Sequence, residues 1–460
     1  MRVLFASAEF APLARVGGLA AAAAGLVAEL RRQDVDVQVV VPDYFTTPMR
    51  GEKVVDLAVP EWAGPARART GTVAGVGEIT LIDASGIARS HPYLQPDGHG
   101  WPDNDRRFMA FSAAIAALIE AVDPDVLHLN DWHTCAALGH LADRPPTVLT
   151  IHTLAYQGRT NPGWLKTIAH NAAAFDQFGD CNPLLGGVQL ADVVVAVSPN
   201  YAAEITTPRG GFGLDAPLRD KGDRLVGILN GIDMDEWDPA SDPHLPVPYS
   251  AADVGPKASI RAELLKAHGL HDGGGPLLTM VTRLVDQKGV DLVLPLAPYL
   301  AGLGASMIVL GDGDQWLADG LSAAAAANPE HLAFVRGYDE PLAHRLFAGA
   351  DVFVMPSRFE PCGLAQMQAM RYGTLPLVTN VGGLHDTVID IDAAPTRGTG
   401  VVVPEASSVA LMDGLHRMVR ACSQSRRRSA MQRRGMAIDW SWRLPAAEHI
   451  VWYRRLAANV

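Results

Sequence analysis

Short apolar runs alternate with helical patterns along the first half of the chain. The runs expected to form strands cover residues 2–7, 35–42, 126–130, 147–152 and 193–198, and helical patterns cover residues 18–32 and 107–122. Strand–helix alternation of this kind is typical of βαβ units, because parallel strands need a crossover helix between them. The pattern therefore predicts a parallel sheet that is covered by helices on both faces.

The alternation stops in a stretch without clear periodicity that contains five prolines, at Pro239, Pro243, Pro246, Pro248 and Pro256. It then resumes with expected strands at residues 277–283, 306–310, 332–335, 351–355 and 375–379. We therefore predict an α/β fold with two doubly wound domains and a cleft at the carboxyl ends of their sheets. The predicted divisions are an N-terminal domain over 1–240, a linker over 241–257, a C-terminal domain over 258–440, and a final helix over 441–460 that packs back across the junction.

Length and composition agree with a folded protein of more than one domain. The chain has 460 residues, of which 48% are hydrophobic and 19% charged, and its net charge is −12. This charge argues against a general nucleic-acid binder, and no apolar run is long enough to span a membrane. The four cysteines show no metal-ligand spacing, which favours a reduced, cytoplasmic location.

The stretch Pro356–Gln366, with the sequence PSRFEPCGLAQ, carries the strongest local signal. It follows an expected buried strand, and Pro361 occupies a position typical of a first helical residue. The backbone N–H groups near Gly363 would then suit an anionic ligand at the helix start, with the carboxylate of Glu360 beside them. A strand-to-helix turn with a capping glutamate is the alternative interpretation.

Polar residues recur at other strand ends. Arg15, Gly17 and Gly18 open the first expected helix, where glycines allow a ligand to approach the backbone closely. Asp131, His133 and His152 follow two neighbouring strands. They could bind a polyhydroxylated ligand, hold a metal ion, or cap local structure, but no further ligand completes a metal site.

Three further candidate sites, formed by four residues, have structural alternatives. Arg283 at a strand end and Lys288 at the expected start of the next helix predict a diphosphate site. The alternative is a surface strand-to-helix loop in which Lys288 is exposed to solvent. Tyr338 could stack on a base or cover the edge of the core. Asn230 lies in an Asn-Gly pair that is also compatible with an ordinary turn.

With these residues assembled, the chain resembles bacterial glycogen synthases and plant starch synthases, which are retaining glucosyltransferases of glycosyltransferase family 5 with the two-domain GT-B fold. The resemblance runs almost end to end. Its motifs include Arg15–Leu19, Trp101–Asn104, Asn130–Thr134, Thr150–His152, Leu154–Gly158, Val197–Pro199, Gly227–Asp233, Gln287–Leu292, Gly337–Glu340, Pro356–Leu364, Gly373–Pro376, Gly382–Leu384 and Asp439–Trp442.

The resemblance implies transfer of glucose from a nucleotide-glucose, ADP-glucose in most bacterial members, to the non-reducing end of an α-1,4-glucan, without a metal or other cofactor. The residues that it implies to be catalytic are Glu360, Arg283, Lys288 and His152. Those that it implies to bind donor or substrate are Arg15, Gly17, Gly18, Asp131, Asn230, Tyr338, Cys362, Gly363 and Leu364. In this assignment Arg283 and Lys288 hold the diphosphate, Tyr338 stacks on the base, and Glu360 lies against the donor glucose.

The chain departs from the family pattern at four positions. Arg15 replaces the usual lysine, Ala21 an aspartate and Thr153 an asparagine. Ala365 stands where the family often has a residue with a hydroxyl side chain. These changes leave two alternatives beside a glycogen synthase: a related retaining glycosyltransferase with another nucleotide sugar or acceptor, and a glucan-binding relative with little turnover.

Overall fold

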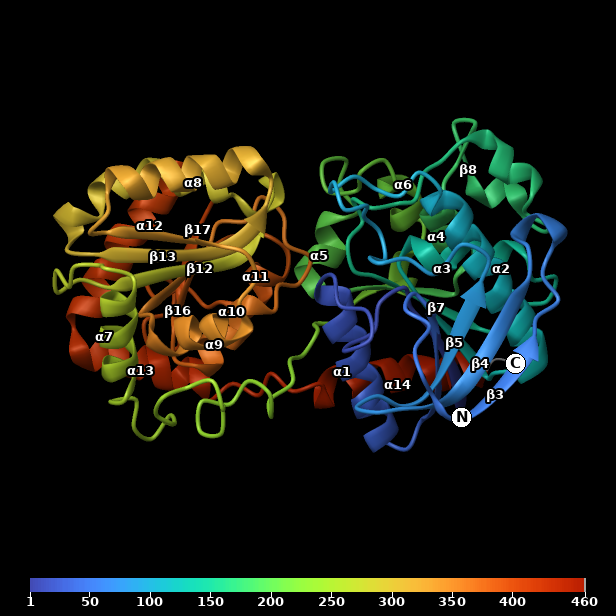
Figure 1. The fold of residues 1–460 in the computed structure, drawn as a ribbon, viewed down its shortest axis with the longest axis horizontal. Helices are drawn as coiled ribbons and strands as arrows, with labels where there is room; N and C mark the ends of the chain where they lie inside the picture. The colour runs from blue at the N-terminus through green and yellow to red at the C-terminus, as the bar shows by residue number, and fades with distance from the viewer. Residues whose placement is uncertain (459–460) are drawn as a thin grey trace. The chain divides into compact units, whose positions relative to one another are not determined.

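The computed structural model describes residues 1–458, which divide into two compact units. Unit 1 comprises Met1–Gly231 together with the C-terminal segment from Trp442, and unit 2 comprises Ile232–Ser441. Each unit has its own α/β sheet (Figure 1), so the prediction of two doubly wound domains is confirmed. In the part of the chain that the structure describes, no helix combines the length and apolar character needed to cross a bilayer.

Unit 1 contains a nine-stranded sheet in the order β11-β10-β7-β6-β1-β2-β5-β4-β3. Seven strands run parallel: β1 (Arg2–Ala6), β2 (Asp36–Pro42), β5 (Gly77–Ala84), β6 (Val126–Asn130), β7 (Thr147–Ile151), β10 (Val193–Ala196) and β11 (Leu225–Gly227). The remaining two, β3 (Arg50–Asp56) and β4 (Ala66–Val73), extend one edge as antiparallel strands. This extension was not predicted, because every residue of β3 is exposed and carries no alternation of buried and exposed positions.

Helices cover both faces of this sheet. One face carries α1 (Gly18–Arg32) and the C-terminal helix α14 (Arg443–Ala457), whose apolar residues share one core with β1, β2 and β6. The other face carries α2 (Asn104–Val122), α3 (Trp132–Cys135) and α4 (Pro183–Leu190), which lie together in Figure 1. Shorter elements complete the unit: α5 (Pro199–Glu204), α6 (Asp215–Arg219) and the β8–β9 hairpin (Asp176–Gln177, Asp180–Cys181).

Unit 2 contains a six-stranded, all-parallel sheet in the order β14-β13-β12-β15-β16-β17. Its strands are β12 (Leu277–Leu284), β13 (Ser306–Gly313), β14 (Leu332–Arg336), β15 (Val352–Met355), β16 (Leu375–Thr379) and β17 (Val401–Val403). Numbered along the chain, the order is 3-2-1-4-5-6, which is the order of dinucleotide-binding folds. Since the order reverses between β12 and β15, the loops after these two strands meet at the position where such sheets bind ligands.

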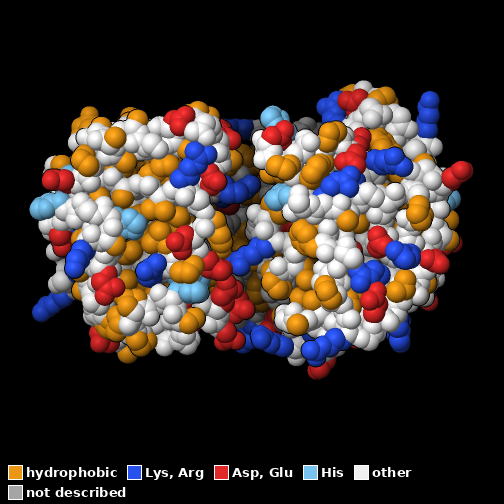
Figure 2. Space-filling view, in the orientation of Figure 1, with side chains coloured by type: hydrophobic (Ala, Val, Ile, Leu, Met, Phe, Trp, Pro, Cys, Tyr) orange, Lys and Arg blue, Asp and Glu red, His pale blue; other side chains and the backbone are white. Residues whose placement is uncertain are grey.

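Helices α8 (Gln315–Ala327) and α12 (Ser408–Ser423) lie on one face of this sheet, and α7 (Lys257–Ala267), α9 (Glu340–Gly349) and α10 (Ala365–Arg371) lie on the other (Figure 1). The unit also contains α11 (Gly382–Thr387) and α13 (Ser425–Met436). On the visible face of each unit, basic side chains lie among acidic ones (Figure 2).

Two residues that were predicted to begin a helix do not begin one. Helix α10 begins at Ala365, so Pro361 lies in the preceding loop rather than at the first helical position. Gly363 accounts for the delay, because its φ of +73° is left-handed and interrupts any helix that passes through it. Lys288 ends a short 3₁₀ turn, Asp286–Lys288, instead of opening an α-helix.

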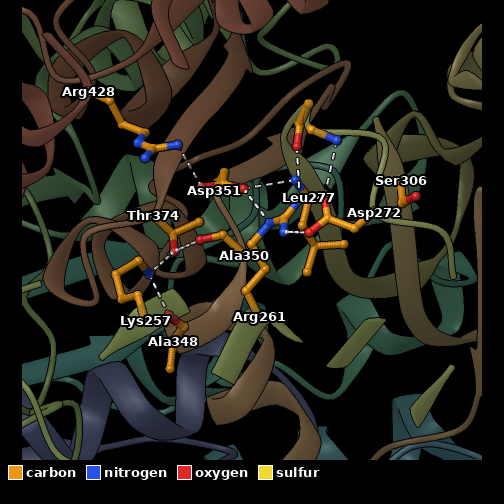
Figure 3. Close-up of polar contacts among 12 residues, drawn as sticks. Lys257, Arg261, Asp272, Leu277, Ser306, Ala348, Ala350, Asp351, Thr374 and Arg428 are labelled. Carbon is orange, nitrogen blue, oxygen red and sulfur yellow. Dashed lines mark hydrogen bonds and ion pairs between the residues drawn. The ribbon is translucent and has the colours of Figure 1, made fainter. Parts of the chain in front are cut away.

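The proline-rich stretch that the sequence suggested as a linker lies within unit 2. Asp242 is buried there and accepts a hydrogen bond from the Tyr372 hydroxyl at 2.5 Å. At the end of the stretch, the ammonium of Lys257 donates to two carbonyls, that of Ala348 at 2.5 Å and that of Tyr372 at 2.9 Å. Ala348 lies in the last turn of α9, and Tyr372 is the residue after α10. Nearby, Arg261 and Arg428 converge on Asp351 (Figure 3). This segment is therefore held by individual buried polar contacts. Such contacts produce no periodic pattern of apolar residues in the sequence.

Candidate active site

The loops that follow β12 and β15 bring a cation and a carboxylate together. Nζ of Lys288 lies 2.6 Å from Oε2 of Glu360, and their side chains are 16% and 7% exposed. The Ser357 hydroxyl donates a second hydrogen bond to the same oxygen, at 3.0 Å. An ammonium has three donors, so Lys288 retains two for an anion while it holds Glu360.

The backbone around Glu360 is fixed from two sides. Its carbonyl accepts a hydrogen bond from Gly383 N at 3.0 Å, and Gln287 donates to the neighbouring carbonyl of Phe359 at 3.2 Å. A Cβ at Gly382 would lie 1.9 Å from the Glu360 carbonyl oxygen, so only glycine fits there. This packing holds the Glu360 side chain at the switch point of the sheet.

The carbonyl groups of Cys362 and Gly363 turn towards the side chain of Gln366. The amide of this buried glutamine donates to the carbonyls of Cys362 at 3.1 Å and Gly363 at 2.8 Å. The first N–H groups of α10, which follows, have no partner within the helix. An anion that lies against this helix start would therefore meet donors rather than carbonyl oxygens.

Arg283 and Tyr338 lie at the ends of β12 and β14, which flank β13, and both are exposed to solvent. Arg283 lies near the end of β12, in register with Asp312 on β13. Tyr338 follows β14, is 74% exposed, and places its hydroxyl 3.4 Å from Oε1 of Glu340. Since two strand spacings separate β14 from β12, Tyr338 lies roughly 10 Å from the loop that carries Lys288.

In unit 1, the loop after β1 is organised by a glutamate that the sequence analysis did not identify. Glu9 is buried, and its Oε2 accepts hydrogen bonds from Val16 N at 3.0 Å and Gly17 N at 2.9 Å. The Tyr93 hydroxyl donates to the other carboxylate oxygen at 2.9 Å. The glutamate thus fixes the backbone directly before Gly18.

The residues predicted in this loop are open to ligands. Arg15 is exposed, and a Cβ built at Gly17 or Gly18 would meet no atom within 4 Å. Helix α1 begins at Gly18, as predicted, so the loop ends at a helix N-terminus.

Asp131 and His152 are brought together at the ends of β6 and β7. The backbone N–H of His152 donates to Oδ1 of Asp131 at 2.7 Å. Burial raises the pKa of Asp131 to about 7, although the N–H groups of His152 and Thr153 oppose the shift. The carboxylate therefore changes charge near neutral pH.

His152 is held as a neutral imidazole. Burial lowers the pKa of His152 to about 3. Its Nε2 lies 2.9 Å from Oδ1 of Asn130, whose amide nitrogen donates to the Ala6 carbonyl at 3.0 Å. Because Oδ1 of Asn130 must accept, Nε2 carries the proton and Nδ1 is left as the acceptor.

The structure does not bring Asn230 to the loop that follows β1. It is half-buried beyond β11, the edge strand of the sheet, and four strand spacings separate β11 from β1. At about 4.8 Å for each spacing, Asn230 lies roughly 19 Å from the loop that follows β1.

Three positioning residues were missed: Glu9, Ser357 and Gln366. Ser357 and Gln366 fall inside the stretch Pro356–Gln366, whose density of polar residues after a buried strand was the available signal. For Glu9 the signal was a lone carboxylate two residues after Ser7, among apolar neighbours.

Comparisons with known proteins cover the whole chain. The family described as the starch synthase catalytic domain matches residues 2–220, and glycosyl transferases group 1 matches residues 262–434. The glycogen synthases of Halorhodospira halophila and Thioalkalivibrio sulfidiphilus are each 42% identical to the chain, and 100% of both chains is covered in each case. The catalytic domain of starch synthase IV from Arabidopsis thaliana, bound to ADP and acarbose, superposes with a TM-score of 0.88 at 30% identity, with 99% of both chains covered. A sucrose-phosphate synthase from Thermosynechococcus elongatus, 20% identical with a TM-score of 0.65, shares the fold.

Proposed function

The chain belongs to the glycogen synthase and starch synthase family of glycosyltransferases, and we propose that it transfers glucose from ADP-glucose to the non-reducing end of an α-1,4-glucan with retention of configuration. The observation that carries this proposal is the contact of 2.6 Å between Lys288 and Glu360 at the switch point of unit 2.

This pair matches the charges that the reaction creates. When the bond between C1 of glucose and the phosphate oxygen breaks, negative charge grows on the leaving diphosphate and positive charge on the sugar. Lys288 and the N-terminus of α10 stabilise the leaving group, and the Glu360 carboxylate stabilises the sugar. Interactions that strengthen as charge develops increase kcat rather than only tightening substrate binding.

The bond changes balance without a covalent enzyme intermediate. The acceptor 4-hydroxyl oxygen attacks C1 on the face that the diphosphate leaves, ADP departs with the bonding electron pair, and the hydroxyl proton passes to a departing phosphate oxygen. Glu360 is tied to Lys288 and Ser357, so we assign it to charge stabilisation rather than to nucleophilic attack.

The remaining assignments follow from polarity and exposure. Arg283 adds a second cation on the β12 side of the donor site, and the exposed ring of Tyr338 offers a flat surface to the base. In unit 1, Asp131 and the neutral ring of His152 supply acceptors for sugar hydroxyl groups. Arg15, Gly17, Gly18 and Asn230 are assigned to substrate binding on the resemblance.

A cytoplasmic location agrees with the state of the cysteines. All four are buried as free thiols, as expected in a reducing compartment.

Release of nucleotide from ADP-, UDP- and GDP-glucose, each with and without glycogen, tests the proposal. We expect ADP-glucose to be used fastest, release to depend on glycogen, and the added glucose to be removed by an exo-acting α-1,4-specific hydrolase. Faster release from another nucleotide sugar would assign the chain to a different donor specificity. Folded protein that binds glycogen but releases no nucleotide from any donor would contradict the enzymatic assignment.

A further inference from the structure

Unit 2 contains a group of metal-ligating side chains that the proposed reaction does not use. One ligand atom each from Glu236, Glu340 and His344 lies within 4.8 Å of the other two. We propose that these three residues form a binding site for a divalent first-row transition cation, of the kind represented by Zn²⁺.

The helix α9 supplies two of the ligands with suitable spacing. Glu340 and His344 are four residues apart near the start of this helix, so their side chains lie on one face. Imidazole suits transition metals, and two carboxylates neutralise the charge of a divalent ion. Mg²⁺, which prefers oxygen ligands in octahedral geometry, fits this donor set less well.

His344 has the carboxylate partner that is typical of metal-bound histidines. The side chain is 2% exposed, and its Nδ1 lies 2.8 Å from Oδ2 of the buried Asp242. A carboxylate on one ring nitrogen fixes the tautomer and directs the other nitrogen at the metal. Within the described residues, no hydrogen bond to Nε2 of His344 is found, and the Trp237 ring stacks on the imidazole at 4.1 Å with an interplanar angle of 12°.

The third ligand lies on a turn of fixed geometry. The backbone N–H groups of Asp235 and Glu236 donate to Oδ1 of Asp233 at 2.9 and 3.1 Å, and Trp237 N donates to the Asp233 carbonyl at 3.1 Å. An ion at the centre of the three ligand atoms would lie no more than about 2.8 Å from each. Shortening these distances to the roughly 2.0–2.2 Å of Zn²⁺ needs side-chain movements below about 1 Å.

Binding of Co²⁺ as a spectroscopic substitute for Zn²⁺ tests the site. The full-length protein is treated with a chelator, desalted and titrated with Co²⁺, and its visible absorption is recorded. We expect one equivalent to bind, Zn²⁺ to displace it, and Mg²⁺ to leave the spectrum unchanged. Glu236→Gln and Glu340→Gln should each weaken binding at least 10-fold, whereas Glu263→Gln, an exposed position on α7, should bind as the wild type does.

Thermal unfolding gives an independent readout. Zn²⁺ at about 100 times its dissociation constant should raise Tm by about 5–10 °C in the wild type and in Glu263→Gln, but not in Glu236→Gln. Because Glu236 is exposed, its substitution should not prevent folding, and circular dichroism verifies this. Absence of saturable Co²⁺ binding, or unchanged affinity in the double variant Glu236→Gln/Glu340→Gln, would overturn the proposal.

Discussion

Replacement of Lys288 by methionine removes a cation but keeps an unbranched side chain of similar length. In the structure, the ammonium lies 2.6 Å from Glu360 and is 16% exposed, so the contact is largely shielded from solvent. A hydrogen bond to a charged group contributes about 1.5–3 kcal/mol. If this contribution is made to the leaving diphosphate in the transition state, kcat should fall by about 10- to 150-fold.

The assay must separate the chemical step from donor binding. We would measure kcat and KM for ADP-glucose at saturating glycogen, together with the dissociation constant of ADP. The loss in kcat should exceed the loss in ADP affinity, because negative charge on the diphosphate is greater in the transition state than in the bound donor. Lys266→Met, at an exposed position on α7, is the matched control and should leave both quantities unchanged.

A double-mutant cycle with Arg283→Ala sharpens the test. If the two cations act on one diphosphate, the double variant should lose less transition-state stabilisation than the sum of the losses in the two single variants. Unchanged kcat in Lys288→Met, or a rise in the ADP dissociation constant that accounts for the whole loss in kcat/KM, would refute the assignment of Lys288 to the transition state.

Three further outcomes are expected. Glu360→Gln should lower kcat by about 100- to 1000-fold but change the ADP dissociation constant only a few-fold, as measured by titration, since the amide oxygen can still accept from Lys288. Burial raises the pKa of Asp131 to about 7, so kcat should rise with pH between about 6 and 8, and Asp131→Asn should remove this rise from the pH profile. Burial lowers the pKa of Lys257 to about 7 from its ordinary 10.5, so the folded state binds fewer protons than the unfolded state between these values. The free energy of unfolding should therefore increase with pH across that window, by up to about 1.4 kcal/mol per pH unit in denaturant titrations, and Lys257→Met should lose this slope.

The parallel strands could be predicted because burial leaves a signal in the sequence. Strands such as β6 and β7 are buried at every position and appear as apolar runs between polar ends. The edge strand β3 has no such signal, since its order comes from pairing with β4 rather than from burial. Element starts were less predictable, because the left-handed conformation of Gly363 depends on the loop around it.

The site could be predicted where its residues are close in sequence or follow parallel strands of one sheet. Glu360 lies in one dense stretch, and its proximity to Lys288 follows from the rule that parallel strands end at one edge of the sheet. The role of Glu9 depends on a contact with Tyr93, far away in the sequence, and on hydrogen bonds to backbone N–H groups. Contacts of this kind are fixed by the folded loop and leave no spacing that a single sequence reveals.

The stability of unit 1 depends on the C-terminal helix α14. Tyr453 on α14 is fully buried, and its hydroxyl lies 2.6 Å from Nδ1 of His128 on β6. Nε2 of the same histidine lies 2.7 Å from the Thr150 hydroxyl, so both ring nitrogens are satisfied only while Tyr453 is present. Tyr453→Phe should therefore leave a buried ring nitrogen without its partner and lower the free energy of unfolding by about 1–3 kcal/mol. In a unit of this size, this corresponds to a fall in Tm of roughly 2–10 °C by calorimetry, whereas Tyr299→Phe, at a side chain that is 60% exposed, should melt as the wild type does. Equal Tm values for the two variants would mean that the Tyr453 hydroxyl contributes nothing to the attachment of α14. The apolar residues of α14 alone would then hold the helix against the sheet.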